Sequence, residues 1–280
     1  MAAGPVWVLW TGTVGFDRPL GERVDAARRA GYGAVSMSPR EPVDREQLAR
    51  AEDAGIGIAV LDAVFSWLRP GDDIGLEGTN PLTVDESLRV TEAMHVTTVN
   101  AIAIRGEPLP VDAIAERFAA FCDRAADAGC RVHLEFAPHS AVPDLATAWD
   151  VVRSAGRDNG GVLFDSWHFF RGTPDFAALQ SVPGDRIFAT QLSDGTADPV
   201  GHWFDETMHR RLLPGDGAFD LVRLVAALAS IGALGLDGPE VISDELHTRP
   251  AAKAAALAGE RLAAVYAQAG VTPPAPFGAP

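Results

Sequence analysis

Cysteine, clustered positive charge and long apolar stretches are all scarce in this sequence of 280 residues. Its two cysteines, Cys122 and Cys130, form no metal-type pair and are expected to be buried thiols of a cytoplasmic protein. With 38 acidic against 23 basic residues and no Lys/Arg-rich run, the surface would repel nucleic acid and anionic lipid. No apolar run approaches the roughly 20 residues that span a bilayer. The N-terminus MAAGPVWVLWTGTVG also lacks the pattern of a signal peptide.

Short β-rich runs alternate with helical stretches along most of the chain. The expected strands are residues 6–10, 33–38, 57–65, 97–104, 131–136, 160–166, 186–194 and 239–245. Strand–helix units of this number in about 250 residues match a (β/α)₈ barrel. An open doubly wound sheet is the alternative, but the first run leads into TGTVGFDRPLGE, which lacks the G-x-G-x-x-G fingerprint. The prediction is a single-domain α/β TIM barrel over residues 1–270, followed by a Pro-rich C-terminal tail at 271–280.

Two of the predicted connections are longer than a barrel needs. Residues 66–83 follow the third strand and residues 195–217 follow the seventh. Both lie on the side of the barrel where the strands have their C-terminal ends. Active sites of such barrels are built there, and long loops at this end often act as lids. We therefore expect the functional site on this side.

Each of the last four predicted strands carries a side chain that can bind a metal ion near its end: Glu135, Asp165, Gln191 and Glu240. Side chains at equivalent heights on adjacent barrel strands converge toward the axis. Three carboxylates packed there would repel one another and raise their pKa values unless a cation neutralised them. A divalent ion is the simplest resolution, and an all-oxygen set favours Mn²⁺ or Mg²⁺ over Zn²⁺. Taken singly, each residue could instead cap a helix or form a salt bridge.

Several motifs together identify a family. They are HLEF (133–136), FDSWH (164–168), ATQLSD (189–194), RLLPGDGAFD (211–220) and PEVISDE (239–245). With them the chain resembles the xylose-isomerase-like barrels grouped as sugar phosphate isomerases and epimerases, which include inosose dehydratase, 3-dehydroshikimate dehydratase and endonuclease IV. The resemblance implies that Glu135, Asp165, Gln191 and Glu240 bind one divalent ion. The third ligand is histidine in most members, and Gln191 is similar to the pattern in one branch of bacterial 3-dehydroshikimate dehydratases.

The resemblance also implies catalytic roles. In epimerases and isomerases of the family two ligating glutamates double as bases on opposite faces of the substrate, and the equivalents here are Glu135 and Glu240. His168 is expected to face the same pocket as a substrate contact or proton carrier. The alternative for His168 is a loop histidine that is hydrogen-bonded to the backbone.

Further residues are candidates for substrate binding. Arg211 precedes PGDG as the family's anion- or hydroxyl-binding arginine does. Arg105, near the end of the fourth predicted strand, could bind a carboxylate or hydroxyl, or form an ordinary salt bridge. Trp67 and Trp167 could form an apolar wall for a sugar or cyclitol ring, or pack in the core.

A divalent ion bound to an α-hydroxyketone polarises the carbonyl and acidifies the adjacent C–H. The predicted function is a metal-dependent isomerase or epimerase, or a dehydratase-type lyase, that removes such a proton from a small keto-sugar, keto-cyclitol or similar keto-polyol. A catalytically silent barrel that binds a sugar or serves as a partner subunit is the alternative. A phosphodiesterase like endonuclease IV needs several more histidines and a basic face, which seven histidines and a charge of −15 do not supply. The resemblance leaves a homo-oligomer open.

Overall fold

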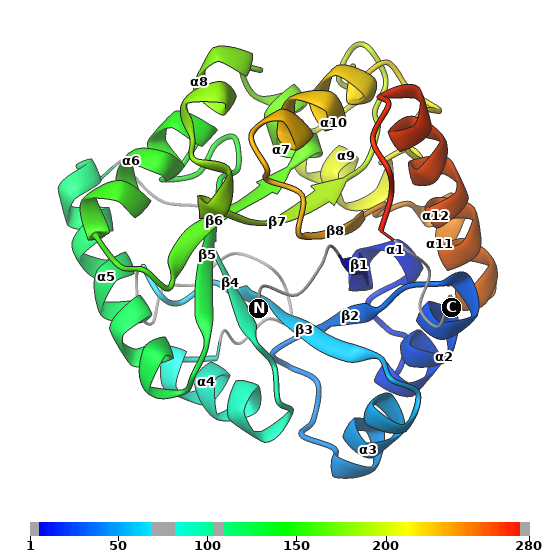
Figure 1. Ribbon diagram of the computed structural model, residues 1–280, viewed down its shortest axis with the longest axis horizontal. Coiled ribbons are helices and arrows are strands. Elements are labelled where there is room, and N and C mark those ends of the chain that lie inside the picture. Colours follow the sequence, from blue (N-terminus) through cyan, green and yellow to red (C-terminus); the bar gives the residue numbers. More distant parts are fainter. Residues whose placement is uncertain (1–5, 69–81, 104–108, 275–280) are drawn as a thin grey trace.

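A computed structural model of the chain describes residues 6–68, 82–103 and 109–274. Within these ranges, parallel strands close into a barrel in the order β1 to β8, and helices surround it (Figure 1). The strands are β1 (Val6–Leu9), β2 (Ala34–Met37), β3 (Gly57–Val64), β4 (Thr98–Ile102), β5 (Arg131–Glu135), β6 (Gly160–Asp165), β7 (Ile187–Leu192) and β8 (Leu236–Pro239). The predicted single-domain TIM barrel is confirmed.

The α-helices fall into two groups. The longer ones follow the strands and cover the barrel: α2 (Leu20–Ala30), α3 (Arg45–Asp53), α4 (Val84–Ala93), α5 (Val111–Asp127), α6 (Leu145–Ala155), α10 (Leu221–Ser230) and α12 (Ala251–Gln268). Shorter helices lie in the connections: α1 (Thr11–Val14), α7 (Ser166–Arg171), α8 (Phe176–Ser181), α9 (Trp203–His209) and α11 (Asp244–His247), with a 3₁₀ turn at Gly184–Arg186. None of these helices combines the length and apolar character that crossing a bilayer requires.

Apolar side chains form two cores, one on each side of the strands. A small cluster that includes Val8, Trp10 and Leu163 fills the inside of the barrel. A much larger cluster packs between the strands and the surrounding helices. Because each strand is covered on both faces, strands such as β6 are buried along their whole length. Most side chains along the strands are therefore apolar, although Asn100 and His133 are buried polar residues in the middle of β4 and β5.

The eighth strand lies earlier in the sequence than predicted. The prediction placed it at 239–245, but β8 is Leu236–Pro239 and the chain leaves the barrel before Val241. Gly238 explains the error, because a Cβ atom at this position would lie 1.9 Å from the carbonyl oxygen of Val8 on β1. Glycine is a poor strand former in general, but here it alone lets the two strands approach closely. Val241 and Ile242, the two apolar residues inside the predicted range, follow β8 and do not belong to it.

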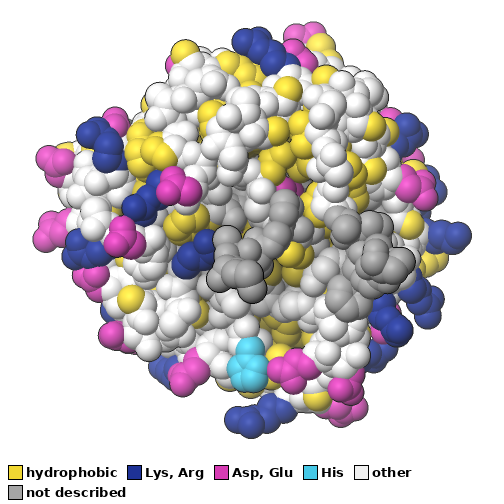
Figure 2. Space-filling view, in the orientation of Figure 1, with side chains coloured by type: hydrophobic (Ala, Val, Ile, Leu, Met, Phe, Trp, Pro, Cys, Tyr) yellow, Lys and Arg dark blue, Asp and Glu magenta, His cyan; other side chains and the backbone are white. Residues whose placement is uncertain are grey.

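Other expectations can be compared with the described residues. Cys122 and Cys130 are free and buried, as predicted. The long connection after β7 contains α9, whereas most of the connection after β3 (69–81) and the last residues of the tail (275–280) lie outside the described residues. On the face shown in Figure 2, basic side chains are scattered among acidic ones and form no continuous basic patch in the described part of the chain.

Candidate active site

The four predicted metal ligands lie at one end of the barrel. Glu135 and Asp165 are the last residues of β5 and β6, Gln191 is one residue from the end of β7, and Glu240 directly follows β8. Asp165 and Gln191 are partners in the register of β6 and β7. All four side chains are buried. The barrel register therefore brings together residues that are far apart in the sequence.

Two local features hold Glu240 in place just beyond its strand. The Thr13 hydroxyl donates to the carbonyl oxygen of Pro239 (2.5 Å) and accepts from the amide of Val241 (3.1 Å). The Glu240 amide donates to the carbonyl oxygen of Leu192 at 3.2 Å. The Thr13 hydroxyl and one backbone hydrogen bond to β7 thus fix the backbone at Glu240, although the residue belongs to no strand.

Glu135, Asp165 and His168 form a buried candidate metal site. His168 Nε2 lies 3.4 Å from Glu135 Oε1 and 3.6 Å from Asp165 Oδ2. One ligand atom from each of the three side chains lies within 4.8 Å of the others. His168 reaches the group because α7 starts directly after Asp165 and places residues three apart on one face. This set contains an imidazole nitrogen, unlike the all-oxygen set predicted from the sequence.

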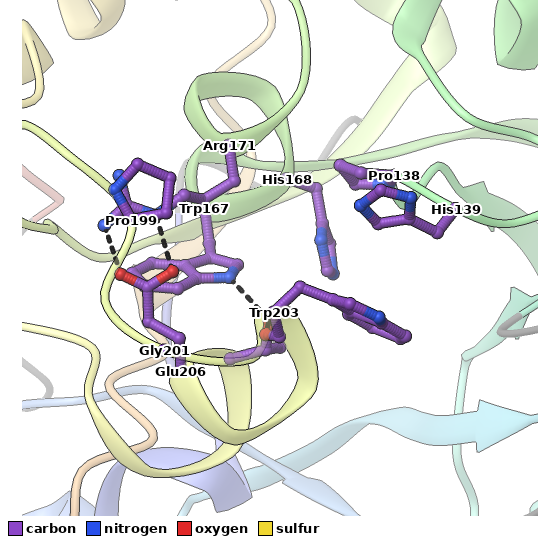
Figure 3. A pocket seen from close by; sticks show the side chains of 10 residues that line it. Pro138, His139, Trp167, His168, Arg171, Pro199, Gly201, Trp203 and Glu206 are labelled. Atoms are coloured by element: carbon purple, nitrogen blue, oxygen red, sulfur yellow. Dashed lines mark hydrogen bonds and ion pairs between the residues drawn. The ribbon is translucent and has the colours of Figure 1, made fainter.

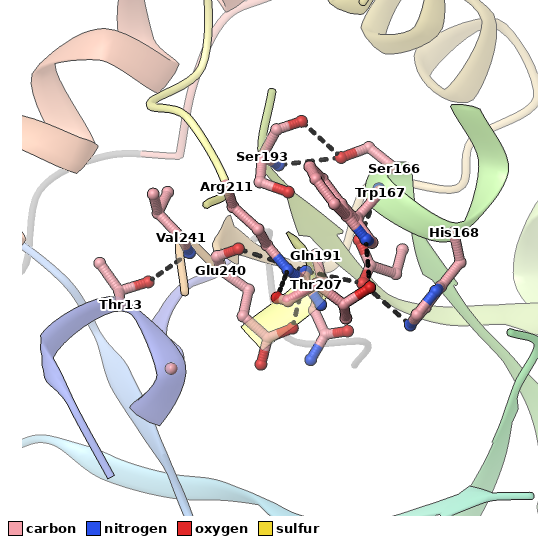
Figure 4. A network of polar contacts seen from close by, with 12 residues as sticks. Thr13, Ser166, Trp167, His168, Gln191, Ser193, Thr207, Arg211, Glu240 and Val241 are labelled. Atoms are coloured by element: carbon pink, nitrogen blue, oxygen red, sulfur yellow. Dashed lines mark hydrogen bonds and ion pairs between the residues drawn. The ribbon is translucent and has the colours of Figure 1, made fainter. Parts of the chain in front are cut away.

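Arg211 lies between two of the predicted ligands (Figure 4). Its Nη1 donates to Asp165 Oδ2 at 2.9 Å and to Glu240 Oε2 at 3.3 Å, and its Nε donates to the carbonyl oxygen of Thr207 at 3.1 Å. The sequence predicted substrate binding for this arginine, but in the structure its buried guanidinium neutralises part of the charge on these two carboxylates. The predicted need for a bound dication is thereby reduced but not removed.

Asp62 is an acidic residue of the site that the prediction did not include, and Asn100 of β4 is its polar neighbour. Asn100 Nδ2 donates to Asp62 Oδ1 at 2.7 Å and to Glu135 Oε2 at 2.6 Å. Gln191 Nε2 donates to Asp62 Oδ2 at 3.4 Å. The signal for Asp62 was present in the sequence, because it is a lone acid inside the otherwise apolar run GIAVLDAVF.

The site holds more negative charge than its one buried arginine balances. Burial raises the pKa of Asp62 to about 7, and the Glu135 carboxylate adds to this shift. Burial also raises the pKa of Glu240 well above its usual value, although Arg211 opposes that change. Asp165 is the remaining carboxyl group in contact with Arg211. Among the described residues, the site thus contains four carboxyl groups (Asp62, Glu135, Asp165 and Glu240) and one guanidinium, which contacts Asp165 and Glu240. The remaining negative charge can be balanced by a divalent cation or by protons.

The donor set fits a divalent ion in a second respect. Gln191 is 1% exposed, yet its Oε1 atom has no hydrogen-bond partner among the described residues, while its Nε2 atom is held by Asp62. A buried amide oxygen without a donor is costly unless something else binds it. Carboxylate and amide oxygens are ligands that hard divalent ions accept, and imidazole suits transition metals as well.

A cavity of about 200 Å³ lies beside His168 (Figure 3). Its walls include the rings of Trp167, Trp203 and His139. The His139 and Trp203 rings lie 5.4 Å apart. Because drug-sized ligands occupy pockets of roughly 300–1,000 Å³, this cavity suits a single small ring and not a nucleotide or an oligosaccharide. Trp167 lines this cavity, and its contact with a substrate stays a prediction.

A buried ion pair holds the outer wall of this cavity. Arg171 donates to Glu206 through Nη2 (2.7 Å) and Nε (3.1 Å), and its guanidinium lies 4.7 Å from the centre of the Trp167 ring. Trp167 Nε1 donates to the hydroxyl of Thr207 at 2.9 Å. These contacts connect α7 with α9 and fix the tryptophan ring. The prediction included neither Arg171 nor Glu206, because their pairing joins two distant segments.

Of the two other predicted substrate residues, Trp67 is not among those that line this cavity. Trp67 packs edge-on against Phe118 with ring centres 5.9 Å apart, and its Nε1 donates to the carbonyl oxygen of Ile102. Its observed contacts are thus those of the core. Arg105 lies outside the described residues.

A closed parallel barrel with buried carboxylates and an imidazole at the C-terminal strand ends defines a TIM barrel with a candidate metal site. A family model described as the xylose isomerase-like TIM barrel matches residues 24–264. The chain belongs to this family, as its motifs predicted.

Curated relatives are distant and match in part. The chain is 32% identical to an inosose isomerase of Bacillus velezensis over 156 residues, which cover 55% of each protein. It is 28% identical to a 3-dehydroshikimate dehydratase of Pseudomonas aeruginosa over 255 residues, which cover 85% of this chain and 38% of that enzyme. The matches thus span about half or less of the length of these relatives.

Solved structures share the fold at lower identity. The IOLI protein with a bound zinc atom superposes with a TM-score of 0.78 at 21% identity, covering 94% of this chain and 98% of that one. An L-ribulose 3-epimerase superposes with a TM-score of 0.71 at 17% identity, covering 96% of this chain and 95% of that one. These similarities establish the architecture.

Proposed function

We propose that this protein is a divalent-metal-dependent isomerase, epimerase or dehydratase that removes a proton next to the carbonyl of a small keto-polyol. The single observation that carries the proposal is the buried group of Glu135, Asp165 and His168 beside a cavity of single-ring size. A divalent ion held there by Glu135, Asp165, Gln191 and Glu240 would polarise the carbonyl and stabilise the developing negative charge. Mn²⁺ or Mg²⁺ is our preferred ion, and zinc is the competing choice because His168 brings a nitrogen donor close.

The names of the relatives narrow the substrate class. Inosose and 3-dehydroshikimate are both six-membered carbocycles that carry a ring ketone and neighbouring hydroxyl groups. A ring of this kind presents an apolar edge that can pack on the tryptophan and histidine rings of the cavity. We therefore propose a cyclic polyol ketone as the preferred substrate, with a keto-sugar as the next choice.

The roles of the side chains follow from their neighbours. Glu135 accepts a hydrogen bond from Asn100 and lies 3.4 Å from His168, so a proton taken up by Glu135 can be passed to His168. His168 could then donate this proton to a departing hydroxyl group in a dehydration, or to the former carbonyl carbon in an isomerisation. Glu240 is the second candidate base, because it directly follows β8 and lies at the same end of the barrel as Glu135.

Two measurements test the proposal. Elemental analysis of the purified protein is expected to find about one divalent ion per chain, which Asp165→Ala abolishes. Incubation of inososes, 3-dehydroshikimate and keto-sugars with metal-loaded protein in D₂O is expected to place deuterium at the carbon next to the carbonyl, and Glu135→Gln is expected to stop this exchange. An absence of exchange and elimination across the whole panel would contradict the proposed activity.

One observation favours the alternative of a silent barrel. Arg211 contacts Asp165 and Glu240 at the distances of ion pairs, which partly satisfies these carboxylates without an ion. In a silent sugar-binding barrel, the same cyclic ketones would bind with measurable heat in a calorimeter but show no exchange in D₂O.

A further inference from the structure

The orientation of one side-chain amide decides which of its atoms faces the candidate metal centre. A glutamine carries an acceptor oxygen and a donor NH₂ group of nearly the same shape, so only its hydrogen bonds distinguish the two ends. In the structure Gln191 Nε2 points to Asp62 Oδ2 at 3.4 Å. The opposite end, Gln191 Oε1, is buried and has no partner among the described residues. The amide oxygen is therefore the end left for a ligand.

Asp62 reaches this amide from β3, while Gln191 lies on β7. An ionised carboxylate only accepts hydrogen bonds, so Asp62 can hold the NH₂ end of Gln191 but not its oxygen. The other carboxylate oxygen, Oδ1, is occupied by Asn100 Nδ2, which at the same time donates to Glu135. A rotation of the Asp62 side chain would therefore break its hydrogen bond with Asn100, the residue that also donates to Glu135.

We propose that Asp62 is a positioning residue that fixes the Gln191 amide with its oxygen toward the metal centre. The inference rests on the proposed function, because it concerns the same metal site. Asp62 itself is no ligand in this scheme, and it acts through the groups that it hydrogen-bonds. Partners of this kind orient metal ligands in proteins, and their loss typically weakens metal binding by about 10–100-fold.

Asp62→Asn gives the sharpest perturbation, because it changes one acceptor oxygen into a donor and keeps the shape. With Asn100 still donating to the remaining oxygen, the new NH₂ group must face Gln191. The Gln191 amide then turns, so that its oxygen accepts from the introduced asparagine and its NH₂ end faces the metal centre. An amide NH₂ group does not ligate a metal ion. We expect the affinity for Mn²⁺ to fall about 10-fold or more.

Asp62→Asn also removes one negative charge near the metal centre, and this loss alone would lower the affinity for Mn²⁺. A second background is therefore needed to separate the effect of charge from that of the Gln191 orientation. Gln191→Glu provides the matched background, because a carboxylate offers an oxygen in either orientation. In that background Asp62→Asn is expected to leave the Mn²⁺ affinity unchanged or to raise it, since the asparagine donates to the new carboxylate and removes its repulsion. Asp62→Ala is a second comparison. It loses the same charge but leaves the amide free, so its affinity is expected to fall less than that of Asp62→Asn.

The measurement is calorimetric titration of Mn²⁺ into chelator-stripped protein. Circular dichroism and thermal unfolding of each stripped variant confirm that it is folded. An equal fall in affinity in both backgrounds, or equal affinities for Asp62→Asn and Asp62→Ala, would overturn the inference while leaving the proposed function intact. Failure of the wild-type protein to bind Mn²⁺, Mg²⁺ or Zn²⁺ would overturn both.

Discussion

Replacing Arg211 with methionine tests the electrostatic reasoning behind the candidate metal centre. The Arg211 side chain is 3% exposed, and its Nη1 lies 2.9 Å from Asp165 Oδ2 and 3.3 Å from Glu240 Oε2. Methionine retains most of the side-chain volume but leaves two buried carboxyl groups without their cation. Removing one partner of a buried ion pair costs about 3–5 kcal/mol of unfolding free energy. At about 2–4 °C per kcal/mol, the Tm is expected to fall by roughly 6–20 °C in the presence of a chelator.

This loss is expected to depend on pH and on metal. Burial already raises the pKa of Glu240, and Arg211 opposes the rise, so removing the arginine raises that pKa further. An acid whose pKa is raised on folding stabilises the protein at low pH and loses this contribution as the pH rises through the folded-state pKa. The deficit of Arg211→Met should therefore be larger at neutral pH than in mild acid. Excess Mn²⁺ should raise the Tm of the variant more than that of the wild-type protein.

Thermal unfolding followed by circular dichroism, with and without Mn²⁺, measures each of these effects. Arg210→Met is the matched control, because Arg210 is the adjacent residue and is exposed. Surface substitutions usually change stability by no more than about 0.5 kcal/mol. If Arg211→Met and Arg210→Met unfold at the same temperature in chelator, the carboxyl groups do not need the arginine. If Mn²⁺ stabilises the wild-type protein and Arg211→Met equally, the ion does not act on the same carboxylates.

Three other predictions concern the metal, a buried acid between β8 and α12, and the substrate pocket. Gln191→His is expected to raise the affinity for Zn²⁺ relative to Mn²⁺ in competitive titrations, because imidazole is a softer ligand than an amide oxygen; an unchanged ratio would place Gln191 outside the metal's ligand set. Burial raises the pKa of Asp237 from 3.8 to about 7, so the stability that its protonated form contributes is lost as the pH rises between these values. Asp237→Asn should remove this loss, up to about 4 kcal/mol at 1.36 kcal/mol per pKa unit, and equal urea midpoints for variant and wild type at pH 8 would contradict it. Trp203→Ala should raise KM about 5–30-fold with a smaller change in kcat, while Trp203→Phe restores most of the affinity; a change in kcat alone would contradict a binding role.

The sequence predicted the barrel because its evidence is local and repeated. Apolar runs such as 160–166 and 131–136 agree with β6 and β5 to within one residue. The prediction failed at β8, where glycine and aspartate hide a strand whose close approach to β1 requires Gly238. Strand propensity averages over many environments, and it cannot register a contact with a residue some 230 positions earlier in the chain.

The site was predicted in part for the same reason. Residues at strand ends can be found by counting strand–helix units, and Glu135, Asp165 and Gln191 do meet at one end of the barrel. The contacts of Asp62 with Gln191 and of Arg171 with Glu206 join segments with no fixed spacing between them. No local pattern encodes such pairs.

The sequence alone thus determined the closed barrel, the end of it that holds the site and the chemical types of side chain gathered there. These follow from period, length and position along each strand, which are properties of neighbouring residues. Only the tertiary structure decided that His168 joins Glu135 and Asp165, that Arg211 separates Asp165 from Glu240, and that Asp62 holds Gln191. Hydrogen bonds typically have donor–acceptor distances of about 2.7–3.2 Å, and these side chains approach such distances only once the whole barrel has closed.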